Sequence, residues 1–382
     1  MLTRRRTFGL AGAAAAGALA RPAIAQPRPL PDLPSTMVWS VYDVGSTGYV
    51  EASAIADAMG RAYGTRVRLQ PSGTSIGRVL PLRQGRASHG WLANELFFAV
   101  EGLYEYAAPD WGPQEFRTLC GRVNGFSVVA TRESGITRPE HLRGKRFAFV
   151  PANSSVNIKV EPVLAFAGLT WNDVQLVQFP SYVASLRALI EGRADAAGAA
   201  PATAVLRELE ASPRGISWVE LDPQNARGWQ AAQRAVPFVE PFQETVGAGL
   251  SQQNPAWVMG YRYPMITVKT ETREEEVYAL MKAVHETFDL YKDVNPIMPR
   301  WEMRLAGTPP MDAAFHPGAR RYLQDVGIWT PEHEQWQERT LRRHEAIKRA
   351  WEQFLPGARS LGQQEFEAAW AERRAAAIAA LG

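Results

Sequence analysis

The side chains best suited to binding a small molecule lie in short turns that follow predicted strands. The candidates are Gly45, Ser46, Thr47, Ser72, Gly73, Thr74, Ser75 and Asn94 in an earlier group of turns, and Asn153, Ser154, Ser155 and Tyr182 in a later group. Most of these turns lead into a predicted helix, whose N-terminus presents unpaired N–H groups and about half a positive charge. Several such ends converging favour an anion. We therefore expect the protein to bind a small organic acid. Its carboxylate would lie on the earlier turns, and the later turns would select the rest of the molecule.

The alternative is that these residues only cap their own helices, since Ser, Thr and Asn are the preferred N-cap residues. Hydroxyl-rich turns follow two successive predicted strands, the first at residues 43–48 and the second at residues 72–75. The carboxyl ends of neighbouring parallel strands form the crevice in which α/β proteins bind ligands, so the repetition favours binding.

A second chemistry is suggested by Gly73-Thr74-Ser75-Ile76-Gly77, which matches the G-x-S-x-G elbow of serine hydrolases. All six histidines follow it, as the hydrolase order requires. However, only one strand and helix precede the serine after the leader, whereas the hydrolase sheet places several strands before it. We therefore expect a binding protein without catalytic residues, and keep hydrolysis as the alternative.

The sequence favours neither a metal, a cofactor nor a disulfide. His333 and His344 are too far apart for a metal-binding pair on one helix face, and His89 lies in an apolar stretch typical of a structural histidine. Cys120 is the single cysteine, which excludes an internal disulfide. Stability must therefore come from the hydrophobic core.

The first 25 residues predict a signal peptide. Arg4, Arg5 and Arg6 precede a short Ala/Gly run, and Ala23-Ile24-Ala25 offers a cleavage site. Arg5-Arg6-Thr7-Phe8 fits a twin-arginine signal, which predicts a periplasmic protein. The apolar run is shorter than the roughly 20 residues that span a bilayer.

The net charge gives no support to nucleic-acid binding once this leader is removed. The whole chain carries +3, but residues 1–25 contain four arginines and no acid. Subtracting these four from 42 basic residues leaves 38 against 39 acidic residues, and the charges are mixed rather than gathered in a stripe.

The elements that would position the turns form a unit used twice. Residues 67–88 and 176–195 each contain a strand, a Pro-Ser turn, a helix, Gly-Arg-Ala and a new strand. Two copies suit two similar lobes of an α/β fold. Residues 274–291 predict one amphipathic helix, residues 211–251 look irregular, and a Thr330-Pro331 helix start opens a helical tail.

The order of short motifs resembles the TAXI-type solute receptors of TRAP transporters over about residues 38–291. The motifs are Val44-Gly45-Ser46-Thr47-Gly48, Ser72-Gly73-Thr74-Ser75, Ser134-Gly135-Ile136, Leu142-Arg143-Gly144-Lys145-Arg146 and Gly192-Arg193-Ala194-Asp195. The resemblance implies a type II periplasmic binding protein with two α/β lobes, and crossover strands at 126–131 and 261–268. It implies a TRAP membrane subunit as partner, with contact to the membrane only through that transporter.

We accordingly expect residues 35–131 plus 256–324 to form lobe 1, residues 132–255 to form lobe 2, and residues 325–382 to form a helical extension lying on the lobes or on a partner. The expected function is an extracytoplasmic receptor that captures a small organic acid. The same fold could instead serve as a ligand-sensing partner of a signalling protein, and the sequence does not separate these two roles.

Overall fold

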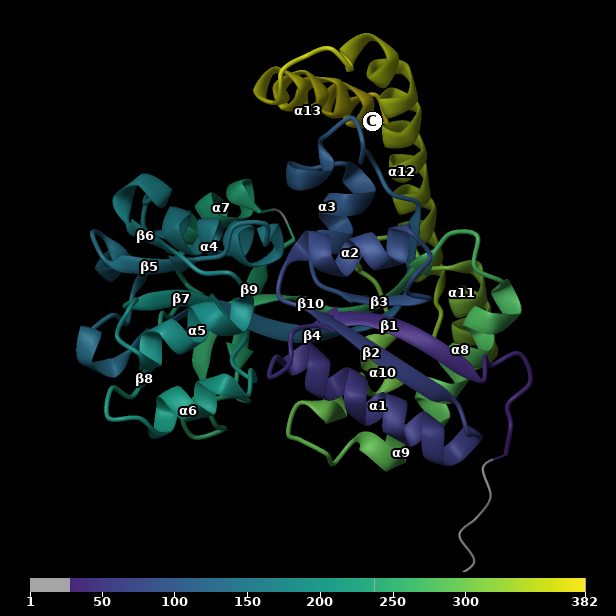
Figure 1. Ribbon diagram of the computed structural model, residues 1–382, viewed down its shortest axis with the longest axis horizontal. Coiled ribbons are helices and arrows are strands. Elements are labelled where there is room, and N and C mark those ends of the chain that lie inside the picture. The colour runs from purple at the N-terminus through teal and green to yellow at the C-terminus, as the bar shows by residue number, and fades with distance from the viewer. Residues whose placement is uncertain (1–27, 237, 382) are drawn as a thin grey trace, which may run out of the picture.

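The computed structural model describes residues 28–236 and 238–381. The predicted signal peptide lies outside the described residues. Figure 1 shows two α/β lobes side by side, with a pair of helices projecting from one of them. No helix among the described residues is both long and apolar enough to cross a membrane.

The first lobe begins with alternating strands and helices, as predicted. Its elements are β1 (Thr36–Tyr42), α1 (Thr47–Tyr63), β2 (Arg66–Ser72), α2 (Ser75–Arg83), β3 (His89–Leu92) and α3 (Glu95–Glu101). Helix α1 buries Ile55 and Met59 against the sheet, at the spacing of one helix face. β1 pairs in parallel with both β2 and β3, so the turns after β1 and β2 meet at one edge.

The second lobe repeats this arrangement. It contains β5 (Arg146–Phe149), α4 (Ser154–Phe166), β6 (Gln175–Gln178), α5 (Tyr182–Ile190), β7 (Ala196–Ala199) and α6 (Val205–Ala211). β5 lies between β6 and β7 just as β1 lies between β2 and β3. The glycines after α2 and α5, Gly85 and Gly192, have φ of +68° and +73°, the left-handed conformation predicted for both. The duplicated unit is therefore confirmed.

Two long strands join the lobes. β4 (Phe116–Thr131) and β10 (Ala256–Lys269) run antiparallel through the middle of one ten-stranded sheet. Eight of its strands follow the order β2-β1-β3-β10-β4-β7-β5-β6, and the other two pair with β4 and β10 off this path. Both extend beyond the predicted crossover segments. The ten residues before Phe126 were missed because Arg122 and Asn124 interrupt the apolar pattern, yet both side chains are buried and hydrogen-bonded.

Two element predictions were wrong. The segment expected to be irregular contains β8 (Ile216–Trp218), α7 (Ala226–Ala235) and β9 (Glu240–Glu244). The predicted single helix over 274–291 is broken into α8 (Glu274–Glu286) and α9 (Phe288–Tyr291) at Thr287, whose hydroxyl donates to the Ala283 carbonyl at 2.7 Å. Such a side-chain bond competes with the helical pattern.

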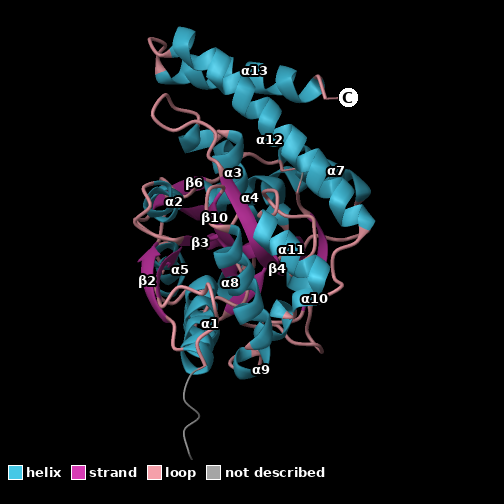
Figure 2. Ribbon diagram, turned by 90° about the vertical axis from the view of Figure 1, so that its right-hand side faces the viewer, coloured by secondary structure: helices cyan, strands magenta, loops and turns pink. Residues whose placement is uncertain are grey.

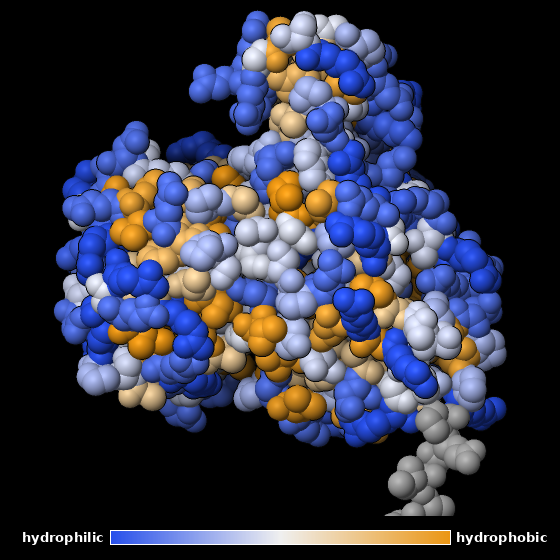
Figure 3. Space-filling model, in the orientation of Figure 1, coloured by the Kyte–Doolittle hydropathy of each residue, from blue (hydrophilic) through white to orange (hydrophobic). Residues whose placement is uncertain are grey.

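Short helices complete the first lobe. They are α10 (Met303–Ala306) and α11 (Pro317–Asp325). Single turns of 3₁₀ helix lie between other elements of both lobes (Tyr104–Tyr106, Arg132–Ser134, Pro139–Leu142, Trp171–Asp173, Met298–Trp301). The apolar core runs through both lobes beneath these helices. On the face seen in Figure 3, apolar residues appear in separate groups among polar ones.

The tail forms a helical hairpin, α12 (Pro331–Ala358) and α13 (Gln363–Ala379). Thr330 caps α12, accepting from the His333 N–H at 3.3 Å with Pro331 in the first helical position, as predicted. The hairpin has its own apolar cluster, which includes Trp351, Phe366 and Trp370. Figures 1 and 2 show α12 rising along lobe 1 and α13 turning back across its end.

Candidate functional site

The turns of lobe 1 begin helices, as their hydroxyls predicted. Ser46 is the N-cap of α1, accepting from the Tyr49 N–H at 3.2 Å, and Gly45 before it has φ of +90°. Thr74, rather than the Pro-Ser pair before it, is the N-cap of α2, accepting from the Gly77 N–H at 3.2 Å. Ser72 ends β2 and accepts from the Thr74 N–H at 3.4 Å. For these residues the simple capping geometry is present.

Other turn residues bond across the two lobes instead. The Ser75 N–H donates to the Ala152 carbonyl at 2.9 Å, and its hydroxyl donates to Asn153 Oδ1 at 3.2 Å. Asn153 Nδ2 donates to the Gly73 carbonyl at 3.0 Å. The Ser155 N–H donates to Ser75 Oγ at 3.2 Å, and Ser154 Oγ lies 3.3 Å from the same oxygen. The first-lobe and second-lobe turns therefore meet directly, and the lobes are closed.

A second group of contacts lies beside the first. Asp43 Oδ2 accepts from the Val183 N–H at 3.0 Å, and the hydroxyls of Thr47 and Thr203 are 3.2 Å apart. Tyr182 is buried, its hydroxyl 3.0 Å from Thr203 Oγ1 and accepting from the Ala200 N–H at 3.1 Å. Tyr182 thus reaches the lobe interface with its polar atom already bonded.

Gly73 is required by this close approach. A Cβ on it would lie 2.4 Å from Ser181 Cβ, nearer than side-chain carbons come in proteins. Only glycine lets the turn after β2 touch the start of α5 across the interface.

Behind the turns lies a buried ion pair that was not predicted from the sequence. Arg78 Nε donates to Glu95 Oε1 at 2.7 Å, and both side chains are 0% exposed. Its guanidinium carbon is 3.4 Å from the centre of the Tyr42 ring, while Nη1 donates to the Ser72 carbonyl at 3.1 Å. Nη2 and Glu95 Oε2 have no hydrogen-bond partner among the described residues. The signal available in the sequence was an arginine within the apolar spacing of α2.

A second buried group of charges adjoins the first. Asn94, predicted as a site residue, donates from Nδ2 to Asp312 Oδ2 at 2.7 Å, and its Oδ1 has no partner within the described chain. Burial raises the pKa of Asp312 to about 7, while the Asn94 hydrogen bond and the Lys159 charge oppose this rise. Burial lowers the pKa of Lys159 to about 7, against attraction by Glu95 and Asp312. Asp312 and Lys159 were not predicted from the sequence, because they are distant from Asn94 along the chain.

A cavity of about 380 Å³ opens beside Asp312, between the two lobes. Its walls come from the crossover strands, from the segment between α7 and β9, and from the turn before α11. The lining residues are Val123, Gln233, Phe238, Val239, Glu240, Tyr261, Arg262, Pro310, Met311 and Asp312. It lies within the size range of ligand sites in proteins, which are mostly apolar with a few polar groups.

The two lobes and their crossover strands match a known family. A model of the NMT1-like family matches residues 43–327, which is most of the chain. The chain belongs to the NMT1-like family. No curated protein matches it. The family match covers both lobes and both crossover strands, and ends before the helical hairpin.

The solved structures similar to this NMT1-like protein include three from bacteria. A Bordetella bronchiseptica RB50 protein is 16% identical, covering 78% of this chain and 91% of its own, with a TM-score of 0.47. The alkanesulfonate-binding protein of Xanthomonas axonopodis pv. citri, bound to MOPS, is 12% identical. The match covers 77% of this chain and 91% of that protein, with a TM-score of 0.40. An amino acid ABC transporter substrate-binding protein of Streptococcus pneumoniae, bound to L-arginine, is 12% identical. The match covers 70% of this chain and 96% of that protein, with a TM-score of 0.40.

The NMT1-like protein has two α/β lobes joined by two crossover strands, as expected. The proposed hydrolase elbow has no matching geometry in the described residues. Ser75 is 0% exposed, and its hydroxyl bonds to Asn153, Ser154 and Ser155 rather than to a histidine.

The described part of this NMT1-like chain contains no group of side chains that could bind a metal ion. Within residues 28–236 and 238–381, no three His, Cys, Asp or Glu side chains are grouped to hold a metal ion. His89 is buried, with Nδ1 2.9 Å from Ser88 Oγ, and burial lowers its pKa to about 3. It is a neutral core residue.

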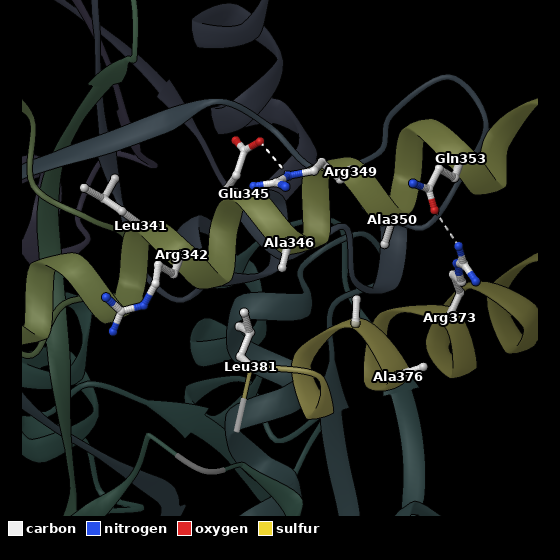
Figure 4. A pocket seen from close by; sticks show the side chains of 11 residues that line it. Leu341, Arg342, Glu345, Ala346, Arg349, Ala350, Gln353, Arg373, Ala376 and Leu381 are labelled. Atoms are coloured by element: carbon white, nitrogen blue, oxygen red, sulfur yellow. Dashed lines mark hydrogen bonds and ion pairs between the residues drawn. The ribbon is translucent and has the colours of Figure 1, made fainter.

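A groove of about 710 Å³ lies elsewhere, between α12 and α13 (Figure 4). Small side chains, including Ala346, Ala350 and Ala376, form its floor, and Arg349 and Arg373 at its edges are engaged by Glu345 and Gln353. None of the site residues predicted from the sequence lines it.

Proposed function

We propose that this protein is an extracytoplasmic solute receptor that captures a small organic acid between its two lobes and delivers it to a TRAP-type membrane transporter. The observation that carries the proposal is the meeting of residues 72–75 with residues 152–155, since the same hydroxyl-rich turns that begin helices also close the lobes. A solute held there would stabilise the closed form over an open one.

The charge at this interface supports an acid. Arg78 lies behind the first-lobe turn, and its Nη2 has no partner among the described residues. Arginine is the side chain best matched to a carboxylate, because its N–H groups form a planar fork. We place the solute carboxylate between Arg78 and the first-lobe turns, with the rest of the molecule selected by the second lobe, near Asn153 and Tyr182.

We propose the same lobe boundaries that the sequence predicts. Residues 35–131 plus 256–324 would form lobe 1 and residues 132–255 lobe 2, with residues 325–382 as an extension. The hinge would lie in β4 and β10, the strands shared by both. Hydrogen exchange with and without solute tests this, since protection should rise at the turns and stay constant in the middle of both strands.

The receptor should shrink when it binds its solute. We expect isothermal calorimetry on residues 26–382 to find a carboxylate that binds, and small-angle scattering to give a smaller radius of gyration with that carboxylate than without it. Tight binding only of neutral or cationic compounds would contradict the acid, and an unchanged radius at saturation would contradict closure.

Matched variants separate binding from folding. Ser75→Ala and Asn153→Ala each remove two or more side-chain hydrogen bonds between the lobes. At about 0.5–1.5 kcal/mol for each bond, affinity should fall by at least roughly 2-fold to 10-fold. Thr330→Ala, which removes the cap of α12 away from these turns, is the control for stability. Unchanged affinity in the first two variants would exclude these turns from the site.

Export and the transport partner are proposals from the motifs. Replacing Arg5 and Arg6 with lysine should block export, because the twin-arginine route reads those two residues. Cell fractionation measures this, and normal export of the double variant would rule out the route. Delivery to a TRAP transporter predicts that vesicles carrying its membrane subunit take up the bound acid only when this protein is added.

A further inference from the structure

Lys159 is a buried cation at the lobe interface that takes no part in the contacts between the turns. It projects from α4 of lobe 2 and is 1% exposed. Its ammonium lies 5.0 Å from the centre of the Phe126 ring and 4.5 Å from that of Tyr261, both on the crossover strands. No hydrogen bond or ion pair to its ammonium exists within residues 28–236 and 238–381.

A buried ammonium without a hydrogen-bonded partner is unfavourable, because it loses its hydration without replacing it. The aromatic faces offset only part of that loss. Glu95 and Asp312 attract the charge from a distance, and Arg78 repels it. Asp312 is engaged by Asn94, and Glu95 by Arg78. The lysine therefore lacks an anion of its own.

Tyr261 links this ammonium with the cavity of about 380 Å³, because it is one of the lining residues and its ring centre lies 4.5 Å from Lys159 Nζ. Phe238, Val239, Pro310 and Met311 supply an apolar wall. Glu240 and Asp312 at the polar side would repel a second carboxylate. Arg262, the other charge there, donates to the carbonyls of Gly121 and Leu305.

We propose that Lys159 is the second-lobe cation of the solute site, that it binds the carboxylate opposite Arg78, and that the cavity beside Tyr261 holds an aromatic or similarly sized apolar body. The solute is then an aryl or branched-chain monocarboxylate. This inference rests on the proposed function, and it narrows the organic acid to one class. Both cations are buried in the closed structure.

The test is calorimetry on the exported chain with phenylacetate, acetate and succinate. We expect phenylacetate to bind at least 10-fold more tightly than either other acid. Lys159→Met, which keeps the length of the side chain and removes its charge, should lower the affinity for phenylacetate at least 10-fold. Lys159→Arg should retain most of the affinity. Equal affinity of Lys159→Met and the unaltered protein for phenylacetate would overturn the proposal.

A second variant keeps the test independent of folding around Lys159. Phe238 is half-buried at the cavity wall. Phe238→Ala should therefore lower the affinity for phenylacetate several-fold and leave the affinity for acetate unchanged. Equal loss for both acids would contradict a cavity for the apolar body. Tight binding of succinate but not phenylacetate would overturn this inference and leave the organic acid receptor standing. Binding of no carboxylate at all would overturn both.

Discussion

Replacing Arg78 with methionine should lower the free energy of unfolding by about 3–5 kcal/mol, because the change leaves the Glu95 carboxylate buried without its partner. Both side chains are 0% exposed and joined at 2.7 Å. The variant also loses the bond from Nη1 to the Ser72 carbonyl and the stacking on Tyr42. Urea denaturation of the exported chain, followed by fluorescence, measures the change.

Two controls make the result specific to the buried charge. Removing both charges in Arg78→Met with Glu95→Leu should recover most of the loss, since apolar pairs often replace buried ion pairs without destabilisation. Arg187→Met breaks an exposed pair with Glu208, whose side chains are 49% and 52% exposed, and should change stability by less than about 1 kcal/mol. A loss as small in Arg78→Met as in Arg187→Met would contradict this role of the buried pair.

Replacing Trp370 with alanine should release α13 from lobe 1 while the lobes stay folded. Trp370 is 1% exposed, its ring centre lies 4.8 Å from that of Trp351, and Nε1 donates to the Gly102 carbonyl at 2.7 Å. Such a truncation costs about 3–5 kcal/mol. The hairpin cluster is small and separate from the main core, so the loss falls on the hairpin as local unfolding.

Limited digestion with trypsin detects that release, because Arg373 and Arg374 follow the tryptophan in α13. Arg374 is bound to the buried Glu101, which also accepts from Arg343 Nε at 2.5 Å, so cleavage there should be slow in the unaltered protein. Glu372→Ala, an exposed change in the same helix, is the control and should leave the rate unchanged. A Trp370→Ala protein digested no faster than this control would refute independent unfolding of the hairpin.

Local patterns were enough to predict the repeated units. Strand, turn and helix starts depend on neighbouring residues, so Ser46 could be identified as a cap, and Gly85 and Gly192 as helix ends, from residue types alone. The same reasoning found the Thr330 cap. It failed for β8, which has only three residues, and for β9, which is polar, because each is a strand only through pairing with β4 or β10.

The sequence by itself determined the α/β class, the two similar lobes and the turns that begin the helices, since these follow from periodicity and from caps within a few residues. Only the tertiary structure decided which polar groups lie together. Arg78 meets Glu95 across 17 positions, and Asn94 meets Asp312 across 218. Such pairs leave no local pattern, because burial and charge compensation depend on how distant elements pack. Lys159 and the cavity lined by Tyr261 could not be predicted for the same reason, because the residues around them come from distant parts of the chain.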